Sequence, residues 1–487
     1  MTRSWQTVLA AAALAATPVM VPAFAQTAPP AEALEEDFAA FLDRLAVPSG
    51  SVEVLRADDG TAELALRDIR IPVDGDRLIL GDIDVSLAGL DGDAVAFEAR
   101  LAAPEVRIAA RRGGDAVIRF EAHVLRGVWS RPLQTVLDLD LRLTGMTAGP
   151  ERGAAGLQAG TLALTVASEL VAPGRWDRLI ALSAADLTAL ERRGEVASAG
   201  RLDVRLVGTG LDLAGYAAVR ETLGLVPHGE LPDADSPEAG LELLTEMIGD
   251  LVDLPGTWGA AVEAEGVRVE GRDGAELDAL RAELRVEPRD DGPADLVWEQ
   301  SVRGFRPARL DLPPAAHGLV LGDFDAEVAI ERLPVADAVR ALYTSLAGGV
   351  GDAETRGGLF GIKALLLLAR QDIALAVRHL RFDAPELGID LTGRARVNPL
   401  AALAAEARFE LVVRGMEQIV AAAARRGDMP ADQIAGFTMI QAMGERLADR
   451  DGQSVHRYVL ELAADGGMRV NDSDIRPLIE AAIDEAR

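Results

Sequence analysis

The sequence predicts an α+β protein built on a long antiparallel β meander, a curved sheet or super-roll, with interspersed amphipathic helices and a helix-richer C-terminal third. Three observations support this prediction. Many segments alternate apolar and polar residues, as in 135–143, where leucine occupies every second position from 137 to 143. Turn signals such as Asp-Gly and Gly-Gly-Asp separate these segments at fairly regular spacing. Three segments also run directly into stretches of helical periodicity.

The alternating segments are the expected strands, and most have one apolar face and one polar, solvent-exposed face. In the first half they are Val52–Leu55, Ala62–Ile71, Arg77–Leu87, Ala94–Ile108, Ala116–Val128, Thr135–Leu143, Leu157–Leu170, Leu179–Leu190 and Glu195–Val207. In the second half they are Val262–Val269, Leu277–Val286, Leu296–Val302, 323–331, 371–382, 387–397, 406–414 and 454–462.

The strand-to-helix passages lie at 201–223, 323–346 and 404–426. In the last, alternation ends at Gly415, after which Met416, Ile419, Val420 and Ala423 recur at helical spacing. An ancient duplication would explain the repetition, as would the ordinary succession of strands and helices in an α+β protein. Helices are expected at 34–46, 237–251, 335–347, 358–369, 416–426, 431–448 and 475–486.

Residues 1–25 have the pattern of a secretory signal peptide. Arg3 supplies a positive start, 8–20 is apolar but short for a bilayer span, and Ala-Phe-Ala at 23–25 is a cleavage signature. We expect cleavage after Ala25, export to the periplasm and no transmembrane span in the mature chain; a retained N-terminal anchor is the alternative.

Composition shifts predict the domain organisation. The signal peptide 1–25 is followed by a loose linker at 26–33, an N-terminal β-rich domain at 34–224, an acidic, Pro-rich linker at 225–240 and a C-terminal α+β domain at 241–487.

Charge and cysteine content exclude several classes of function. The chain of 487 residues has a formal net charge of −29, which repels nucleic acid. It contains no cysteine, which excludes disulfides, thiolate metal sites and cysteine nucleophiles. With 49% hydrophobic residues it can still bury a substantial core.

No catalytic, cofactor-binding or metal-ligating residues stand out. The histidines are His123, His228, His317, His379 and His456, and no pair has metal-site spacing. His123 and His379 lie within expected strands, where a surface or hydrogen-bonded imidazole is the usual state. No nucleophile elbow, Walker A or dinucleotide fingerprint is present, so we expect no cofactor and no enzyme activity.

The acidic residues have ordinary explanations. Asp323, Asp325 and Glu327 alternate on one strand face that we expect to be solvated. The Asp-Arg-Asp-Gly at 449–452 resembles the start of a calcium loop, but Leu460 occupies the required acidic position, so a turn is expected. Asp474 is expected to cap the closing helix.

A meander with an apolar face must cover that face with helices, a second sheet or a ligand. Because the first half offers few helices, a lipid or another apolar ligand, or an envelope protein, is the partner that this surface predicts. Two halves packed as a sandwich would leave no pocket. A hydrolase with paired carboxylates acting on an envelope polymer, and a purely structural envelope component, are the alternative functions.

Parts of the chain resemble a family. In 406–475, a strand and Arg-Gly-Met-Glu lead into a helix, then a helix with Gln433 and Gln441, then Asp-Gly at 451–452 and a closing strand pair ending Met-Arg-Val-Asn at 468–471. With Leu-Pro-Val-Ala at 333–336, this is similar to uncharacterised alphaproteobacterial periplasmic proteins of the YdgA/AsmA-like kind. The resemblance covers about half the chain and implies a cell-envelope protein without assigned catalytic residues. AsmA-like proteins carry an N-terminal anchor, whereas this chain is expected to have a cleavable signal.

Overall fold

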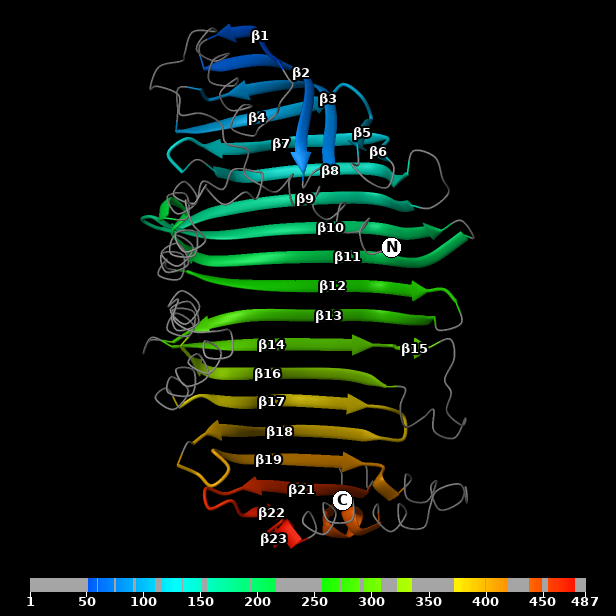
Figure 1. Ribbon diagram of the computed structural model, residues 1–487, viewed down its shortest axis with the longest axis vertical. Coiled ribbons are helices and arrows are strands. Elements are labelled where there is room, and N and C mark those ends of the chain that lie inside the picture. Colours follow the sequence, from blue (N-terminus) through cyan, green and yellow to red (C-terminus); the bar gives the residue numbers. More distant parts are fainter. Residues whose placement is uncertain are drawn as a thin grey trace, which may run out of the picture. The chain divides into compact units, whose positions relative to one another are not determined.

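Antiparallel strands dominate the computed structural model (Figure 1). It describes residues 51–58, 60–73, 76–90, 93–109, 115–133, 135–150, 156–191, 194–215, 256–271, 274–289, 293–307, 322–334, 372–398, 400–417, 438–448 and 454–477. Strands make up 78% of these residues and helices 5%, which confirms the predicted β meander. The helix-richer C-terminal third is not supported, because its described part is also mainly strand.

Most of the expected helices cannot be compared with the structure. Those at 34–46, 237–251, 335–347 and 358–369 lie outside the described residues, as do the signal peptide and both linkers. Helix is present at 416–417, 438–443 and 476–477, inside three of the expected helices, and at 213–215. The helix expected at 431–448 does not extend to its predicted end, because residues 445–448 form a strand.

The chain divides into two compact units, Met1–Ala264 and Glu265–Arg487. The division falls within strand β12 (Thr257–Val269). The domain boundaries expected from composition stay a prediction.

The first unit is an antiparallel meander. Its strands are β1 (Ser51–Asp58), β2 (Thr61–Val73), β3 (Asp76–Ala88), β4 (Ala94–Leu101), β5 (Glu105–Ala109), β6 (Ala116–Arg119), β7 (Ala122–Ser130), β8 (Thr135–Pro150), β9 (Gly156–Ala172), β10 (Arg175–Glu191) and β11 (Gly194–Leu211). Each pairs with its neighbours in chain order, except that β4 and β5 together occupy one position in the meander, and β6 and β7 the next.

Two expected strands are therefore broken, which corrects the prediction of continuous strands at Ala94–Ile108 and Ala116–Val128. The first break is a bend at 102–104 that contains Pro104, which has no N–H for the ladder. The second lies opposite it, at residues 120–121. The imidazole of His123 supplies a hydrogen-bond acceptor at this break, because its Nε2 accepts the backbone N–H of Leu101 at 2.9 Å.

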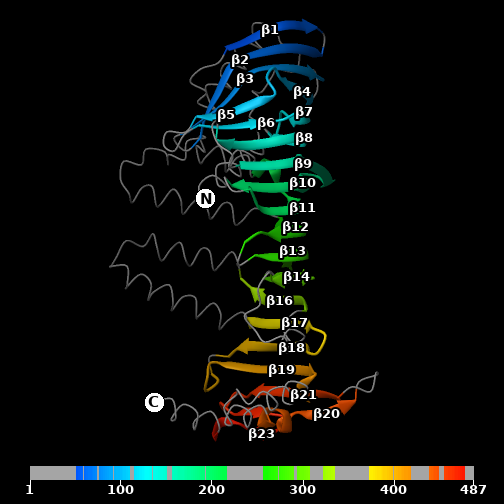
Figure 2. The ribbon, with the colours of Figure 1, turned by 90° about the vertical axis from the view of Figure 1, so that its right-hand side faces the viewer.

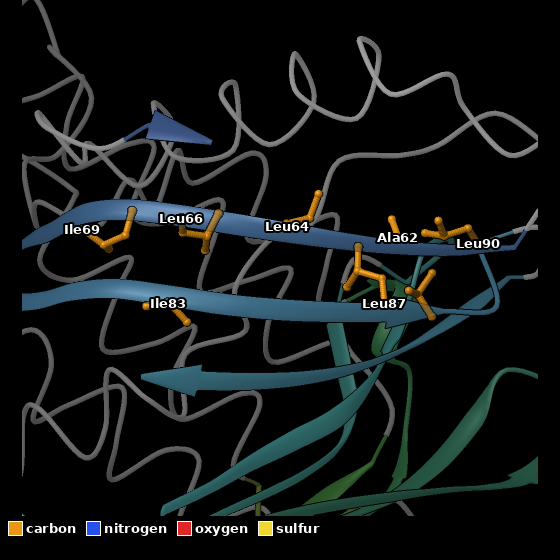
Figure 3. Packing of buried hydrophobic residues seen from close by; sticks show 8 residues of the cluster. Ala62, Leu64, Leu66, Ile69, Ile83, Leu87 and Leu90 are labelled. Carbon is orange, nitrogen blue, oxygen red and sulfur yellow. The ribbon is translucent and has the colours of Figure 1, made fainter. Parts of the chain in front are cut away.

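Register places apolar residues in rows across the first unit. One row runs from Leu64 to Val85, and another from Leu139 through Val166 to Ile180. At the N-terminal end, buried side chains of β2 and β3 form one cluster (Figure 3): Ala62, Leu64, Leu66, Ile69, Ile83 and Leu87, joined by Leu90 and Val95. A second cluster contains Trp129, Val136, Leu139, Leu164 and Val166.

The second unit is another antiparallel meander. After β12 come β13 (Ala275–Pro288), β14 (Ala294–Arg303), β15 (Arg306–Pro307), β16 (Asp323–Leu333), β17 (Ala374–Asp383), β18 (Gly388–Val397), β19 (Ala405–Arg414), β20 (Glu445–Ala448), β21 (Ser454–Leu462), β22 (Met468–Val470) and β23 (Ser473–Asp474). The order β13–β14–β16–β17–β18–β19–β21 follows from the pairings, with β20 and β22 both on the far edge of β21. Seen edge-on in Figure 2, β13–β19 lie in one layer.

Gly415 ends β19 at the position where the sequence changes period. Its φ is 85°, a left-handed conformation that favours glycine. A Cβ at this position would collide with the carbonyl oxygen of Glu386. The strand therefore turns toward buried Met416 through a conformation and a space that only glycine fits.

We expect Gly415→Ala to lower the free energy of unfolding by about 2–4 kcal/mol, since it adds a backbone clash to a strained φ. The matched control is Gly466→Ala, at a similar φ of 81° but with only the exposed Ala402 methyl 3.1 Å away. Urea denaturation would compare the two variants. Equal losses would show that the contact with Glu386 does not constrain the turn.

Candidate functional site

An exposed apolar patch lies on one face of the second unit. Leu284, Trp298, Ile330 and Leu375 come from β13, β14, β16 and β17 and are 36–44% exposed. Register brings them together, because Leu284 pairs with Trp298 and Ile330 pairs with Leu375. Half-buried apolar residues complete the two rows: Val286, Leu296, Val328 and Val377. We call these eight residues the apolar patch.

The same face is covered at its other end. There Val413, Met416, Tyr458 and Val470 form a buried cluster with flanking apolar side chains. The apolar face is thus buried over β19 and β21 but open over β13–β17. An exposed group of large apolar side chains on a sheet face is a feature of binding surfaces.

The opposite face of β13–β17 is covered by ion pairs. Val297 and Ala329 have no exposed surface although they point to the polar side. Arg285 spans three strands, reaching Glu287 at 2.9 Å, Glu299 at 3.1 Å and Glu327 at 3.2 Å. The long arginine side chains bury the small residues beneath them while their charged ends stay paired.

A second arginine closes this network. Arg378 reaches Glu327 at 2.7 Å and Glu287 at 3.3 Å. The hydrogen bond from Arg285 is the main cause that lowers the pKa of Glu287, and Arg378 adds to it. The hydrogen bond to Glu287 likewise raises the pKa of Arg285. The charges of this face therefore hold strands together and are not free to attract a ligand.

The first unit has a shallow hollow of about 630 Å³ over β3, β4, β7, β8 and β9. Its lining takes three consecutive residues from each strand, so both faces of the strands contribute: Ser86–Ala88, Ala96–Glu98, Arg126–Val128, Asp138–Asp140 and Thr165–Ala167. Arg126 pairs with Asp140 at 3.0 Å. Phe97 is the aromatic residue of the lining, and its ring lies against Gly127.

The described histidines have separate structural surroundings. The contact of His123 with Leu101 confirms a hydrogen-bonded imidazole. His379 Nε2 lies 2.5 Å from Asp325 Oδ1 on the polar face. His456 is buried, and within the described residues its Nδ1 has no hydrogen-bond partner. His228 and His317 lie outside the described residues.

The expected solvated strand face of β16 is polar, but its acids are paired. Asp325 contacts Arg303 at 2.9 Å, and Glu327 joins the network above. Asp474 Oδ1 accepts the backbone N–H of Arg476 at 3.0 Å, which confirms the predicted cap. Two hydrogen bonds from Arg476 lower the pKa of Asp474 to about 2. The 449–452 turn lies outside the described residues.

A glycosidase needs one carboxyl group with a raised pKa as its general acid. Within the described ranges, every carboxyl group with a shifted pKa has it lowered: Glu105, Asp278, Glu287, Asp295, Asp383, Glu410 and Asp474. None of these seven suits that role.

The described part of the chain contains no group of three or more His, Asp or Glu placed to hold a metal ion. It also contains no helix with the length and apolarity of a membrane span.

Comparisons of the chain with protein-family models, with curated proteins and with solved structures gave no match. The resemblance to the YdgA/AsmA-like family therefore stays a prediction. The apolar patch is a feature of the described structure that packing within the second unit leaves unexplained.

The patch residues do not stand out in the sequence. Their alternation was visible, but it is shared by every strand of the meander. Which part of an apolar face stays open depends on what packs on it, and no local pattern encodes that.

The hydrogen bond and burial of His123 predict that the stability of the fold depends on pH. Burial, with a smaller contribution from Arg100, lowers the pKa of His123 below its ordinary value of 6.5. The unfolded chain therefore binds the proton first, and stability falls as the pH drops below about 6.5. His123→Asn removes this titration, so the wild type should lose stability relative to the variant between pH 8 and pH 5.5 in urea denaturation. Parallel stability curves would contradict the proposed contact.

Proposed function

We propose that this chain is an exported, non-enzymatic protein of the periplasm that binds an apolar, lipid-like ligand on the apolar patch of its second unit. The single observation that supports the proposal is the open patch around Leu284, Trp298, Ile330 and Leu375. Export rests on the sequence of residues 1–25 alone.

The dimensions of the patch suit an acyl chain. Its four strands, spaced about 4.8 Å apart, give a width of roughly 15 Å, and its two rows lie about 7 Å apart along the strands. Burial of half-exposed Leu and Trp side chains under a ligand releases water from apolar surface, the main source of affinity at such sites.

The ion pairs on the opposite face support the choice of the apolar face as the binding surface. Because Arg285 and Arg378 are engaged with carboxylates, that face offers little unpaired charge to a partner. The apolar face instead offers surface whose burial is favourable. A protein partner is the second occupant that a flat patch could accept, and the experiment separates the two.

The test is native mass spectrometry with lipid extraction on protein purified from periplasm without detergent. We expect an apolar ligand in defined stoichiometry. Leu284→Gln/Leu375→Gln should reduce its occupancy by at least about tenfold, the loss of roughly 1.4 kcal/mol or more of apolar contact.

The matched control is Leu55→Gln/Val124→Gln, which changes two side chains of comparable exposure in the first unit. It should retain wild-type occupancy. An apo mass, or equal loss of ligand in both double variants, would contradict the proposal. A co-purifying protein lost only in the patch variant would assign the patch to a protein partner.

A further inference from the structure

The β9–β10 hairpin of the first unit has an exposed apolar tip. Leu170 and Val171 are 55% and 50% exposed, and Ala172 and Pro173 are also exposed. Arg175 pairs with Ala172, so Pro173 and Gly174 form the two-residue turn. Gly174 has φ 70°, as the third residue of a type II turn requires after proline.

Packing within the sheet does not explain this tip. Side chains alternate between faces along a strand, and a strand with one buried face needs apolar residues only at every second position. Here four consecutive residues are apolar, so the β9 side of the hairpin end is apolar on both faces. A Cβ added at Gly174 would meet no atom within 4 Å, so the space beside the turn is open at this position.

The residues behind the tip have a definite order. Trp176 is half-buried and pairs with Leu170, so its ring lies at the base of the tip. Arg175 pairs with Ala172 and so lies nearer the turn than Trp176, while Glu169 pairs with Asp177 behind the tryptophan. An apolar end with a tryptophan at its base matches a membrane interface, where tryptophan lies at the headgroup level and the long side chain of an arginine can extend to the headgroups.

We propose that this hairpin tip inserts into the headgroup–acyl boundary of a bilayer with zwitterionic headgroups. A narrow projection that is apolar on both faces is surrounded completely by fluid lipid, whereas a folded protein would need a matching socket. The net charge of −29 disfavours anionic headgroups. This surface shares no residue with the apolar patch and does not depend on the proposed ligand.

The attachment is weak and reversible. A single myristoyl chain gives an association constant of about 10⁴ M⁻¹ with lipid, and the tip buries less apolar surface than such a chain. Contact with the membrane is therefore transient.

Flotation of the full chain with phosphatidylcholine vesicles tests the proposal. We expect the wild type to float with the vesicles and Leu170→Thr/Val171→Thr to reduce the floating fraction at least fivefold. Threonine keeps the strand propensity of these positions, and circular dichroism would verify the fold. Leu55→Thr/Val124→Thr changes residues of comparable exposure elsewhere and should float as the wild type does.

A second measurement locates the tip. Lipids brominated in the acyl chain should quench tryptophan fluorescence of the wild type, and Trp176→Phe should remove most of that quenching. Wild-type protein that does not float, floats only with anionic vesicles, or floats equally well as the Leu170/Val171 variant would overturn the proposal. Because ligand occupancy of the patch is measured without vesicles, either proposal can fail alone.

Discussion

The alternation of side chains along antiparallel strands is the constraint on which the rest of this structure depends. Each strand sends successive side chains to opposite faces, and antiparallel register carries that choice from one strand to the next. In the first unit Leu139 pairs with Val166, which pairs with Ile180. In the second, Leu284 pairs with Trp298, which pairs with Val328. A slip of one residue would move every member of a row to the wrong face.

The two faces of the second unit are stabilised by different physics. On the polar face, Arg285 and Arg378 reach across strands, so ion pairs cover Val297 and Ala329. On the apolar face a hydrophobic cluster covers β19 and β21 but leaves the patch open. Small apolar residues on the polar face are therefore fully buried under arginine side chains, whereas large apolar residues of the patch remain exposed to solvent. Apolar side chains are usually the ones that are buried, and this exception is why we assign binding to the apolar face.

Much of the fold could be predicted because alternation and turn chemistry are local. The strand at 406–414 was expected within one residue of β19, and Gly415 marked its end. The breaks near Pro104 and Phe120 could not be predicted, because they depend on adjacent strands breaking together and on His123 filling the gap. The network of Arg285 requires register across three strands. The openness of the patch depends on distant packing, so the candidate site was not visible in the sequence.

Single-cysteine labelling tests the assignment of faces most directly, because the chain contains no cysteine of its own. Ile330→Cys and Ala329→Cys place a thiol on neighbouring residues with 36% and 0% exposure. Both variants would be reacted with a maleimide under native conditions, after circular dichroism confirms folding. The account predicts that the thiol at 330 reacts at least tenfold faster than the thiol at 329. Equal rates, or faster reaction at 329, would contradict both the ion-pair cover and the open apolar patch.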